Sequence, residues 1–148
     1  MWYGAMRQVY PYLTIAGAIP FWFCAICLML DIQTVPVLGD VQNILMVYGL
    51  VISSFLAGSH WGQHLHIDGR WKILLPLSSN VIAVLLWFAY VVLAFKAMLV
   101  GFGVSFVILL LIDKMLHQEK IIDSDYYRIR IIVTVLVVAS LIVSGVFV

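Results

Sequence analysis

The stretch ILLPLSSNVIAVLLWFAYVVLAFKAMLVGFGVSFVILLLI, residues 73–112, carries a single charged side chain, that of Lys96. A membrane-spanning helix needs about 20 mostly apolar residues, so this stretch is long enough for two crossings. We predict one helix over residues 73–95 and a second over residues 97–112, with a tight turn at Phe95 and Lys96. One long bent helix is the alternative, because the second segment is short for a full crossing.

Three further apolar stretches, residues 9–30, 41–61 and 129–148, are each close to the length of a bilayer crossing. Hydrophobic residues make up 65% of the chain and charged residues only 10%, whereas soluble domains carry roughly a quarter charged residues. The excess of apolar surface must therefore face lipid. The sequence predicts an all-α, multi-pass membrane protein whose residues 1–148 form a single domain of five transmembrane helices.

The basic residues predict how the five helices are oriented. Loops on the cytoplasmic side carry an excess of lysine and arginine, and an N-terminus inside with a C-terminus outside places all but Lys96 on that side. The inner residues are then Arg7, Arg70, Lys72, Lys114, Lys120, Arg128 and Arg130. One long bent helix would move the last four outside, which disfavours that alternative. The net charge of +1 excludes a broad basic surface for nucleic acid.

Small residues recur every fourth position in the second predicted helix, at Ser54, Gly58 and Gly62. Such spacing lets two helix backbones approach closely within a membrane. The stripe predicts helix packing, either inside the five-helix bundle or at an interface with a second copy or a partner subunit. In the first helix, Pro20 cannot donate to the carbonyl of Ala16, so we predict a kink there, with Gly17 allowing a neighbour to approach.

Polar residues gather near the inner ends of the predicted helices. At about 100° per residue, Ser53, His60 and His64 share one stripe of the second helix. Ionisable residues in or near a spanning segment indicate function or a specific partner, because burial without a partner is costly. We therefore predict a polar pocket for a quinone, a lipid headgroup or a small anion, formed by His60, Asn80, Asp113 and Arg130. A simple topology-fixing ion pair between Asp113 and Arg130 is the alternative.

Other candidate sites are weaker. The spacing of His60, His64 and His66 suits a metal only poorly, since no glutamate or cysteine accompanies them. Cys24 and Cys27 lie in an apolar helix, where we expect them to pack in the core. No nucleophile elbow or phosphate-binding loop is present. We predict no metal, no cofactor and no catalytic residue, and hence a protein that is not an enzyme.

Three segments resemble the motifs of a known family. Residues 17–21, GAIPF, resemble its G-x-x-P-F motif, and residues 54–62, SFLAGSHWG, resemble its S-F-L-G-G-x-H-W-G motif. Asp113 and residues 127–134, YRIRIIVT, are similar to its closing pattern. On these residues the chain resembles the domain of unknown function 3429 family, which includes transmembrane protein 69 and short proteobacterial proteins. The resemblance implies a small multi-pass protein of a bacterial inner membrane, or of the mitochondrial inner membrane in a eukaryote, and it implies no catalytic residues.

Two functional hypotheses follow, and membrane lipids are expected partners in both. The first is an accessory or structural subunit that packs through its small-residue faces against a larger membrane complex, such as a respiratory one. The second is a quinone- or lipid-binding protein with an inner-leaflet polar pocket around His60. The sequence favours the first hypothesis slightly.

Overall fold

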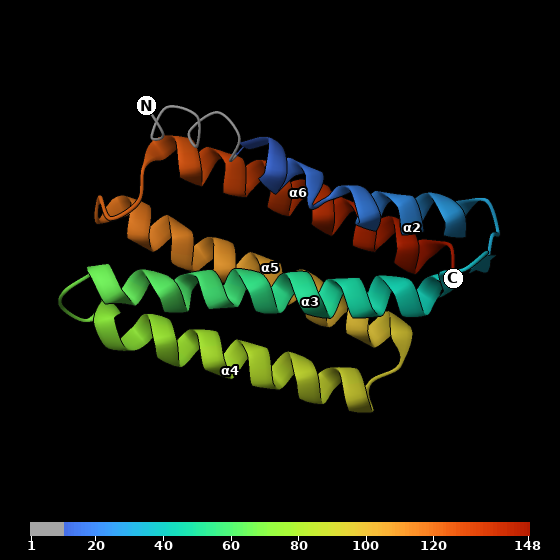
Figure 1. Ribbon diagram of the computed structural model, residues 1–148, viewed down its shortest axis with the longest axis horizontal. Helices are drawn as coiled ribbons and strands as arrows, with labels where there is room; N and C mark the ends of the chain where they lie inside the picture. The colour runs from blue at the N-terminus through green and yellow to red at the C-terminus, as the bar shows by residue number, and fades with distance from the viewer. Residues whose placement is uncertain (1–10) are drawn as a thin grey trace.

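The computed structural model describes residues 11–148, which form a bundle of long apolar helices (Figure 1). Within that range, five spans are long and apolar enough to cross a membrane. The first span, Pro11–Met29, contains α2 (Ile19–Met29). It is followed by α3 (Val41–Gln63), α4 (Trp71–Val92), α5 (Phe95–Gln118) and α6 (Ser124–Val146). The all-α membrane bundle is confirmed. The predicted start of the first helix at residue 9, and Arg7, lie outside the described residues.

The two crossings predicted within residues 73–112 are separate helices. α4 ends at Val92 and α5 begins at Phe95, so the chain turns two residues before the predicted position. The predicted end of α5 at Ile112 is wrong, because the helix continues to Gln118 and buries Asp113 and Leu116. Likewise, α6 begins at Ser124 rather than at residue 129. Apolar length identifies the membrane-crossing part of a helix, and these helices continue into more polar sequence.

The helix α3 contacts three of the other helices. It packs against α2, α4 and α5, while α6 packs against α2 and α5. Short strands β1 (Thr34–Val35) and β2 (Gly39–Asp40) pair in the loop between α2 and α3. The short 3₁₀ helix η1 (His64–His66) follows α3.

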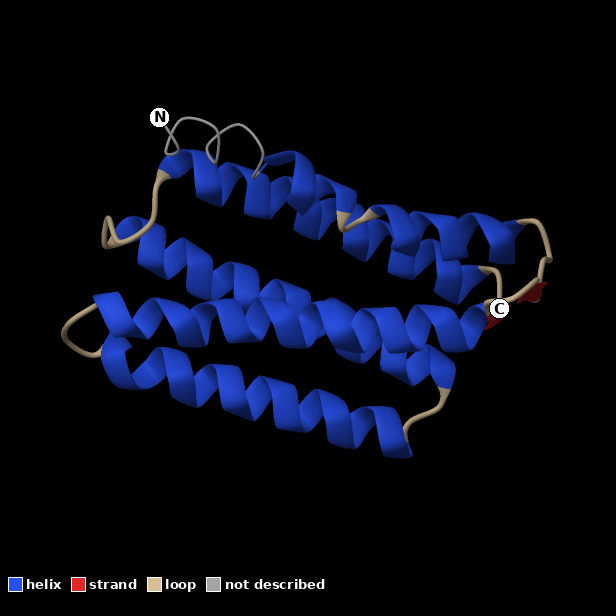
Figure 2. Cartoon of the chain, in the orientation of Figure 1, coloured by secondary structure: helices blue, strands red, loops and turns tan. Residues whose placement is uncertain are grey.

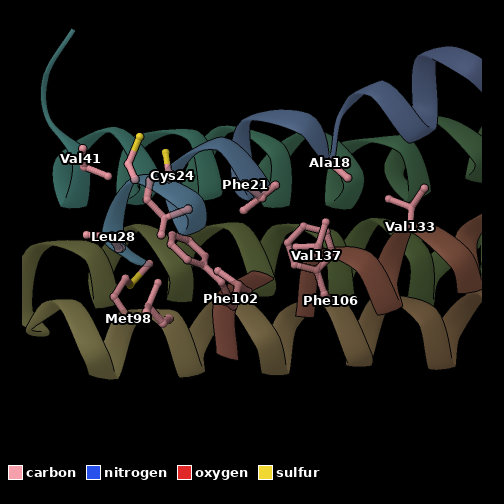
Figure 3. Close-up of a cluster of buried hydrophobic side chains, with 14 of the residues drawn as sticks. Ala18, Phe21, Cys24, Leu28, Val41, Met98, Phe102, Phe106, Val133 and Val137 are labelled. Carbon is pink, nitrogen blue, oxygen red and sulfur yellow. The ribbon is translucent and has the colours of Figure 1, made fainter. Parts of the chain in front are cut away.

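The main apolar core lies between α2, α3, α5 and α6 (Figure 3). Phe21 is fully buried there, with its ring edge-on to the rings of Tyr48 and Phe106 at centroid distances of 5.1 and 5.9 Å. Cys24 and Cys27 are buried in the same cluster, as predicted. Many other large apolar side chains, such as Phe55 and Trp87, point outward. An apolar exterior has no hydrophobic cost in lipid, where helices associate by close packing and polar contacts.

The first span bends where predicted. Its helix is interrupted by a turn at Gly17 and Ala18, visible as a short tan segment in Figure 2, and Pro20 lies in the first turn of α2. The Tyr48 hydroxyl donates a hydrogen bond of 2.9 Å to the Gly17 carbonyl. This contact supplies a partner at the bend, where the regular helical pattern is broken.

The predicted role of the small-residue stripe inside the bundle is wrong. Gly58 and Gly62 are exposed, and a Cβ atom added to either would meet nothing within 4 Å. Ser54 is half-buried. The face of α3 that enters the bundle instead contains Val41, Leu45, Gly49, Ser53, Ala57 and His60. Four-residue spacing shows that the small residues share one side of the helix, but not whether that side faces the bundle or the surroundings. An interface with another chain stays a prediction.

Two loops meet at the end of the bundle that we call the charged end, formed by residues 64–70 and 119–123. Arg70 forms an ion pair with Glu119, and the Trp71 indole N–H donates to the same carboxylate at 2.6 Å. The hydrogen bonds from Trp71 and Arg70 lower the pKa of Glu119. Every lysine and arginine of residues 11–148 except Lys96 lies at or near this end, the distribution on which the predicted orientation rests.

Gly49 should be the close-packing glycine of α3. A Cβ atom there would lie 2.6 Å from the buried ring of Phe102, and overpacking typically costs about 1–3 kcal/mol. We expect Gly49→Ala to lower the thermal unfolding temperature of the protein in detergent micelles. Gly58→Ala is the matched control and should be neutral or slightly stabilising, because alanine favours the helix. Equal behaviour of the two variants would contradict the packing described.

Cysteine labelling tests the predicted orientation. Asp68 at the charged end and Val37 at the opposite end both have fully exposed side chains, and the native cysteines are buried. In intact expressing cells, a membrane-impermeant maleimide should label Val37→Cys at once and Asp68→Cys only after the membrane is permeabilised. The reverse pattern would invert the orientation.

Candidate functional site

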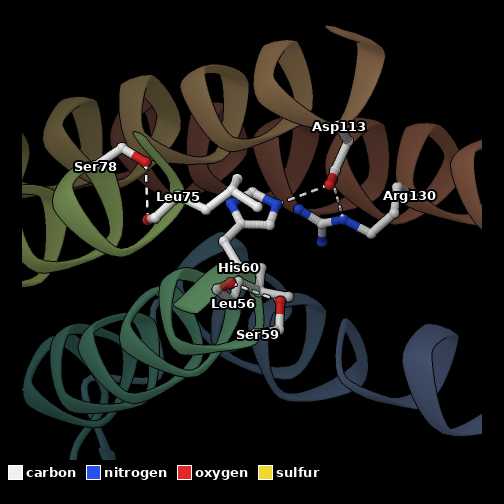
Figure 4. A network of polar contacts seen from close by, with 7 residues as sticks. All are labelled: Leu56, Ser59, His60, Leu75, Ser78, Asp113 and Arg130. Carbon is white, nitrogen blue, oxygen red and sulfur yellow. Dashed lines mark hydrogen bonds and ion pairs between the residues drawn. The ribbon is translucent and has the colours of Figure 1, made fainter. Parts of the chain in front are cut away.

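Three ionisable side chains from three helices meet inside the bundle (Figure 4). His60 of α3 places its Nε2 atom 2.7 Å from Oδ1 of Asp113 on α5. Arg130 of α6 donates from Nε to Oδ2 of the same carboxylate at 2.6 Å. We call this set the triad. The predicted pairing of Asp113 with Arg130 is present, and His60 joins it.

The triad is withdrawn from solvent and lipid alike. His60, Asp113 and Arg130 are 1%, 0% and 2% exposed. The negative carboxylate offsets the positive guanidinium, and His60 Nε2 hydrogen-bonds with the second carboxylate oxygen. The ion pair of Asp113 and Arg130 has no net charge, which favours its burial, because an unpaired buried charge is strongly destabilising.

Helical periodicity places each residue of the triad on the buried face of its helix. His60 lies seven residues after Ser53, and both are buried on one face of α3, as the predicted stripe requires. On α6, Arg130 belongs to a buried strip with Val133, Thr134 and Val137, at spacings of three, four and seven residues. Asp113 holds the corresponding inward position near the end of α5.

Several polar atoms around the triad are buried without a hydrogen-bond partner among residues 11–148. They are Ser53 Oγ, His60 Nδ1, Gln63 Oε1, Arg130 Nη1 and Thr134 Oγ1. Burying such a group unpaired costs a few kcal/mol. Native proteins usually satisfy buried polar atoms with ordered water or a ligand. The site therefore offers hydrogen-bonding capacity beyond what its own side chains use.

One side of the triad borders a groove of about 450 Å³ between the first span, α3 and α6. Its walls are mainly apolar, and its polar side chains are contributed largely by α3 and α6. The lining residues are Leu13, Thr14, Gly17, Ile52, Phe55, Leu56, Ser59, Gln63, Tyr126, Arg130, Val133 and Val137. Leu13 and Phe55 are strongly exposed, so the groove is bordered by side chains that face the bilayer.

Asn80 does not belong to the site, and the prediction that it does is wrong. It is exposed, and its side-chain amide donates to the Pro76 carbonyl of its own helix at 2.8 Å. The inward face of α4 contains Leu75 and Ser79 instead. Neighbouring residues on a helix point about 100° apart, so depth in the membrane alone does not identify the inward side chain.

His64 also lies outside the triad. It is half-buried in η1, where its ring packs edge-on to Trp61 and its Nδ1 atom contacts the Trp61 carbonyl. Within residues 11–148, no three histidine, cysteine, aspartate or glutamate side chains gather closely enough to hold a metal ion.

Sequence reasoning missed the role of Gln63 and Tyr126, which line the groove beside Arg130. The helix predicted over residues 41–61 ends before Gln63, whereas α3 continues to Gln63. A signal was available: Gln63 follows His60 by three residues and Tyr126 precedes Arg130 by four, spacings that keep side chains on neighbouring positions of a helix.

Charge balance in the triad predicts unequal effects of its residues. Asp113→Asn leaves the Arg130 charge buried without its partner and should cost about 3–5 kcal/mol of stability. Arg130→Met should cost less, because the Asp113 carboxylate keeps its hydrogen bond with His60. The double variant carries no buried charge and should recover much of the loss caused by Asp113→Asn.

Detergent-titrated unfolding of the purified variants measures these differences. Lys114→Met is the control, because Lys114 is exposed beside Asp113 on α5 and should contribute little. Strictly additive costs in the double variant would show that the three side chains do not act as one charge-balanced unit.

Comparison with known proteins identifies a family but no characterised relative. No curated protein and no solved structure matches the chain. The family model described as "Protein of unknown function (DUF3429)" matches residues 3–146, nearly the whole chain. The match spans all five helices and all three residues of the triad. The chain is therefore a member of the DUF3429 family.

Proposed function

We propose that this protein binds a lipid-soluble amphipathic molecule, of the quinone or lipid class, in the groove between the first span, α3 and α6. The polar head would lie against Arg130 and Gln63, and the apolar tail along Ile52, Leu56 and Val137. The observation that carries the proposal is Arg130 itself: this buried residue lines the groove and has an Nη1 atom without a partner among the described residues.

The form of the groove supports binding. Pockets for small molecules usually enclose about 300–1,000 Å³ and combine apolar walls with a few placed polar groups. The groove has both properties, at about 450 Å³. Its contact with exposed apolar side chains suits a ligand that enters sideways from the bilayer rather than from water.

The triad supports the same proposal by holding Arg130 in place. Asp113 accepts from Nε, and His60 donates to the other carboxylate oxygen. A guanidinium restrained through one nitrogen presents the remaining donors at a fixed position. In binding sites, the residue that contacts the ligand is typically held in place by such hydrogen bonds from neighbouring side chains. We propose binding without catalysis, because the sequence contains no nucleophile-elbow pattern.

An accessory role in a larger membrane complex, such as a respiratory one, is the second candidate. The exposed stripe of Ser54, Gly58 and Gly62 favours it, because a Cβ atom on either glycine would meet nothing, which leaves space for the backbone of a partner helix. We propose a bacterial or mitochondrial inner membrane as the location under either function.

Two neighbouring substitutions on α3 separate the candidates. Ser59 lines the groove, whereas Gly58 points away from the bundle. We expect Ser59→Leu to reduce the amount of lipid-soluble ligand that remains bound on purification by about tenfold, because the larger side chain fills the groove. Gly58→Leu, the matched control, should leave ligand retention unchanged.

Native mass spectrometry of the protein purified from its own membrane measures the retained ligand, and the same preparations report bound protein subunits. If the accessory role holds as well, Gly58→Leu should release the partner and Ser59→Leu should not. A wild-type protein that retains no lipid-soluble molecule would refute the binding proposal.

A further inference from the structure

We propose that the head group bound in the groove is uncharged and carries both a hydrogen-bond acceptor and a hydroxyl donor, as in a reduced quinone or a diacylglycerol. This inference rests on the proposed function. It narrows the ligand class from the net charge of the site and from which of its atoms donate and which accept hydrogen bonds.

Charge is the first argument. Arg130 is the only lysine, arginine, aspartate or glutamate among the described residues that line the groove, and its charge is already offset by Asp113 at 2.6 Å. His60 meets the other oxygen of that carboxylate and adds no charge in its neutral form. A carboxylate or phosphate head would bring a second negative charge close to Asp113, where little water screens the repulsion. The balanced triad therefore favours a neutral head.

The second argument is which atoms of the site donate and which accept hydrogen bonds. Arg130 Nη1 can only donate and Gln63 Oε1 can only accept. Both atoms are buried and unpartnered within residues 11–148, and both residues line the same groove. A ligand that satisfies both atoms must offer an acceptor and a donor. A hydroxyl group supplies both functions, whereas an ionised carboxylate, a phosphate or an oxidised quinone supplies acceptors only.

Two sources of membrane-soluble molecules share this chemistry. A reduced quinone carries phenolic hydroxyls on a ring with an apolar tail. A diacylglycerol carries one hydroxyl beside ester carbonyls on two acyl chains. In both, the head is compact and neutral and the tail can continue from the groove into the bilayer.

Binding of four short-chain probes to the full-length purified protein in micelles tests the inference. The probes are decylubiquinol, decylubiquinone, dioctanoylglycerol and dioctanoylphosphatidate. We expect decylubiquinol or dioctanoylglycerol to bind at least about tenfold more tightly than dioctanoylphosphatidate, and decylubiquinol several-fold more tightly than decylubiquinone. Tighter binding of decylubiquinol than of dioctanoylglycerol would identify the quinol as the source, and the opposite order would identify the glyceride.

Variants of two residues provide the controls. Gln63→Leu should remove the preference for decylubiquinol over decylubiquinone, because the acceptor is lost. Asp113→Asn leaves Arg130 unbalanced and should shift the preference toward dioctanoylphosphatidate. Since that variant is expected to be less stable, Gln63→Lys supplies a second test by adding a positive charge to the groove, and it should produce the same shift.

The outcomes separate this inference from the proposed function. If dioctanoylphosphatidate binds the wild-type protein most tightly, the neutral-head inference fails and the proposed groove stands. If none of the four probes binds, both fail together. Unchanged selectivity in Gln63→Leu and in Gln63→Lys would exclude Gln63 from head-group recognition and would overturn the inference even if the wild-type preference were as expected.

Discussion

Two hydrogen bonds accepted by one buried carboxylate hold the charged half of this bundle together. Asp113 has no exposed surface, so burying its carboxylate is favourable only with positive charge and hydrogen-bond donors around it. Arg130 supplies the charge and His60 the second donor. These three side chains come from α5, α6 and α3. Satisfying Asp113 therefore fixes the relative positions of three helices.

The apolar core and the triad hold together different parts of the bundle along its length. Close packing around Phe21, Phe102 and Phe106 joins α2 to α3, α5 and α6 (Figure 3). Toward the charged end, the hydrogen bonds of Asp113 with His60 and Arg130 join α3, α5 and α6 (Figure 4). The first span bends at Gly17 and Ala18. Leu13, Thr14 and Gly17 border the groove, whereas Ala18 and Phe21 belong to the core.

The sequence predicted those features that depend on apolar length and on the depth of a residue in the membrane. Such one-dimensional signals predict the five crossings, the separation of α4 from α5, the bend near Pro20 and the pairing of Asp113 with Arg130. Rotation about the helix axis was less predictable. In a soluble protein the polar face of a helix identifies its outer side, but here the lipid-facing and core-facing sides are both apolar. For that reason the interior alternative for the Gly58 stripe and the predicted place of Asn80 in the site are wrong, and the helix predicted over residues 41–61 stops short of Gln63.

The helix α3 shows how one small chain can present two separate surfaces. At 100° per residue, the groove positions Leu56, Ser59 and Gln63 form one face, and the core positions Ala57 and His60 form the adjacent face.

The stripe of Ser54, Gly58 and Gly62 lies roughly 120° from the groove face by the same geometry. A partner helix on the stripe would lie beside the groove, because Phe55 lines the groove and precedes Gly58 by three residues. His60 belongs to α3 and is linked to Arg130 through Asp113. A shift of α3 that disturbed the bond between His60 and Asp113 would alter the restraint on the guanidinium that lines the groove.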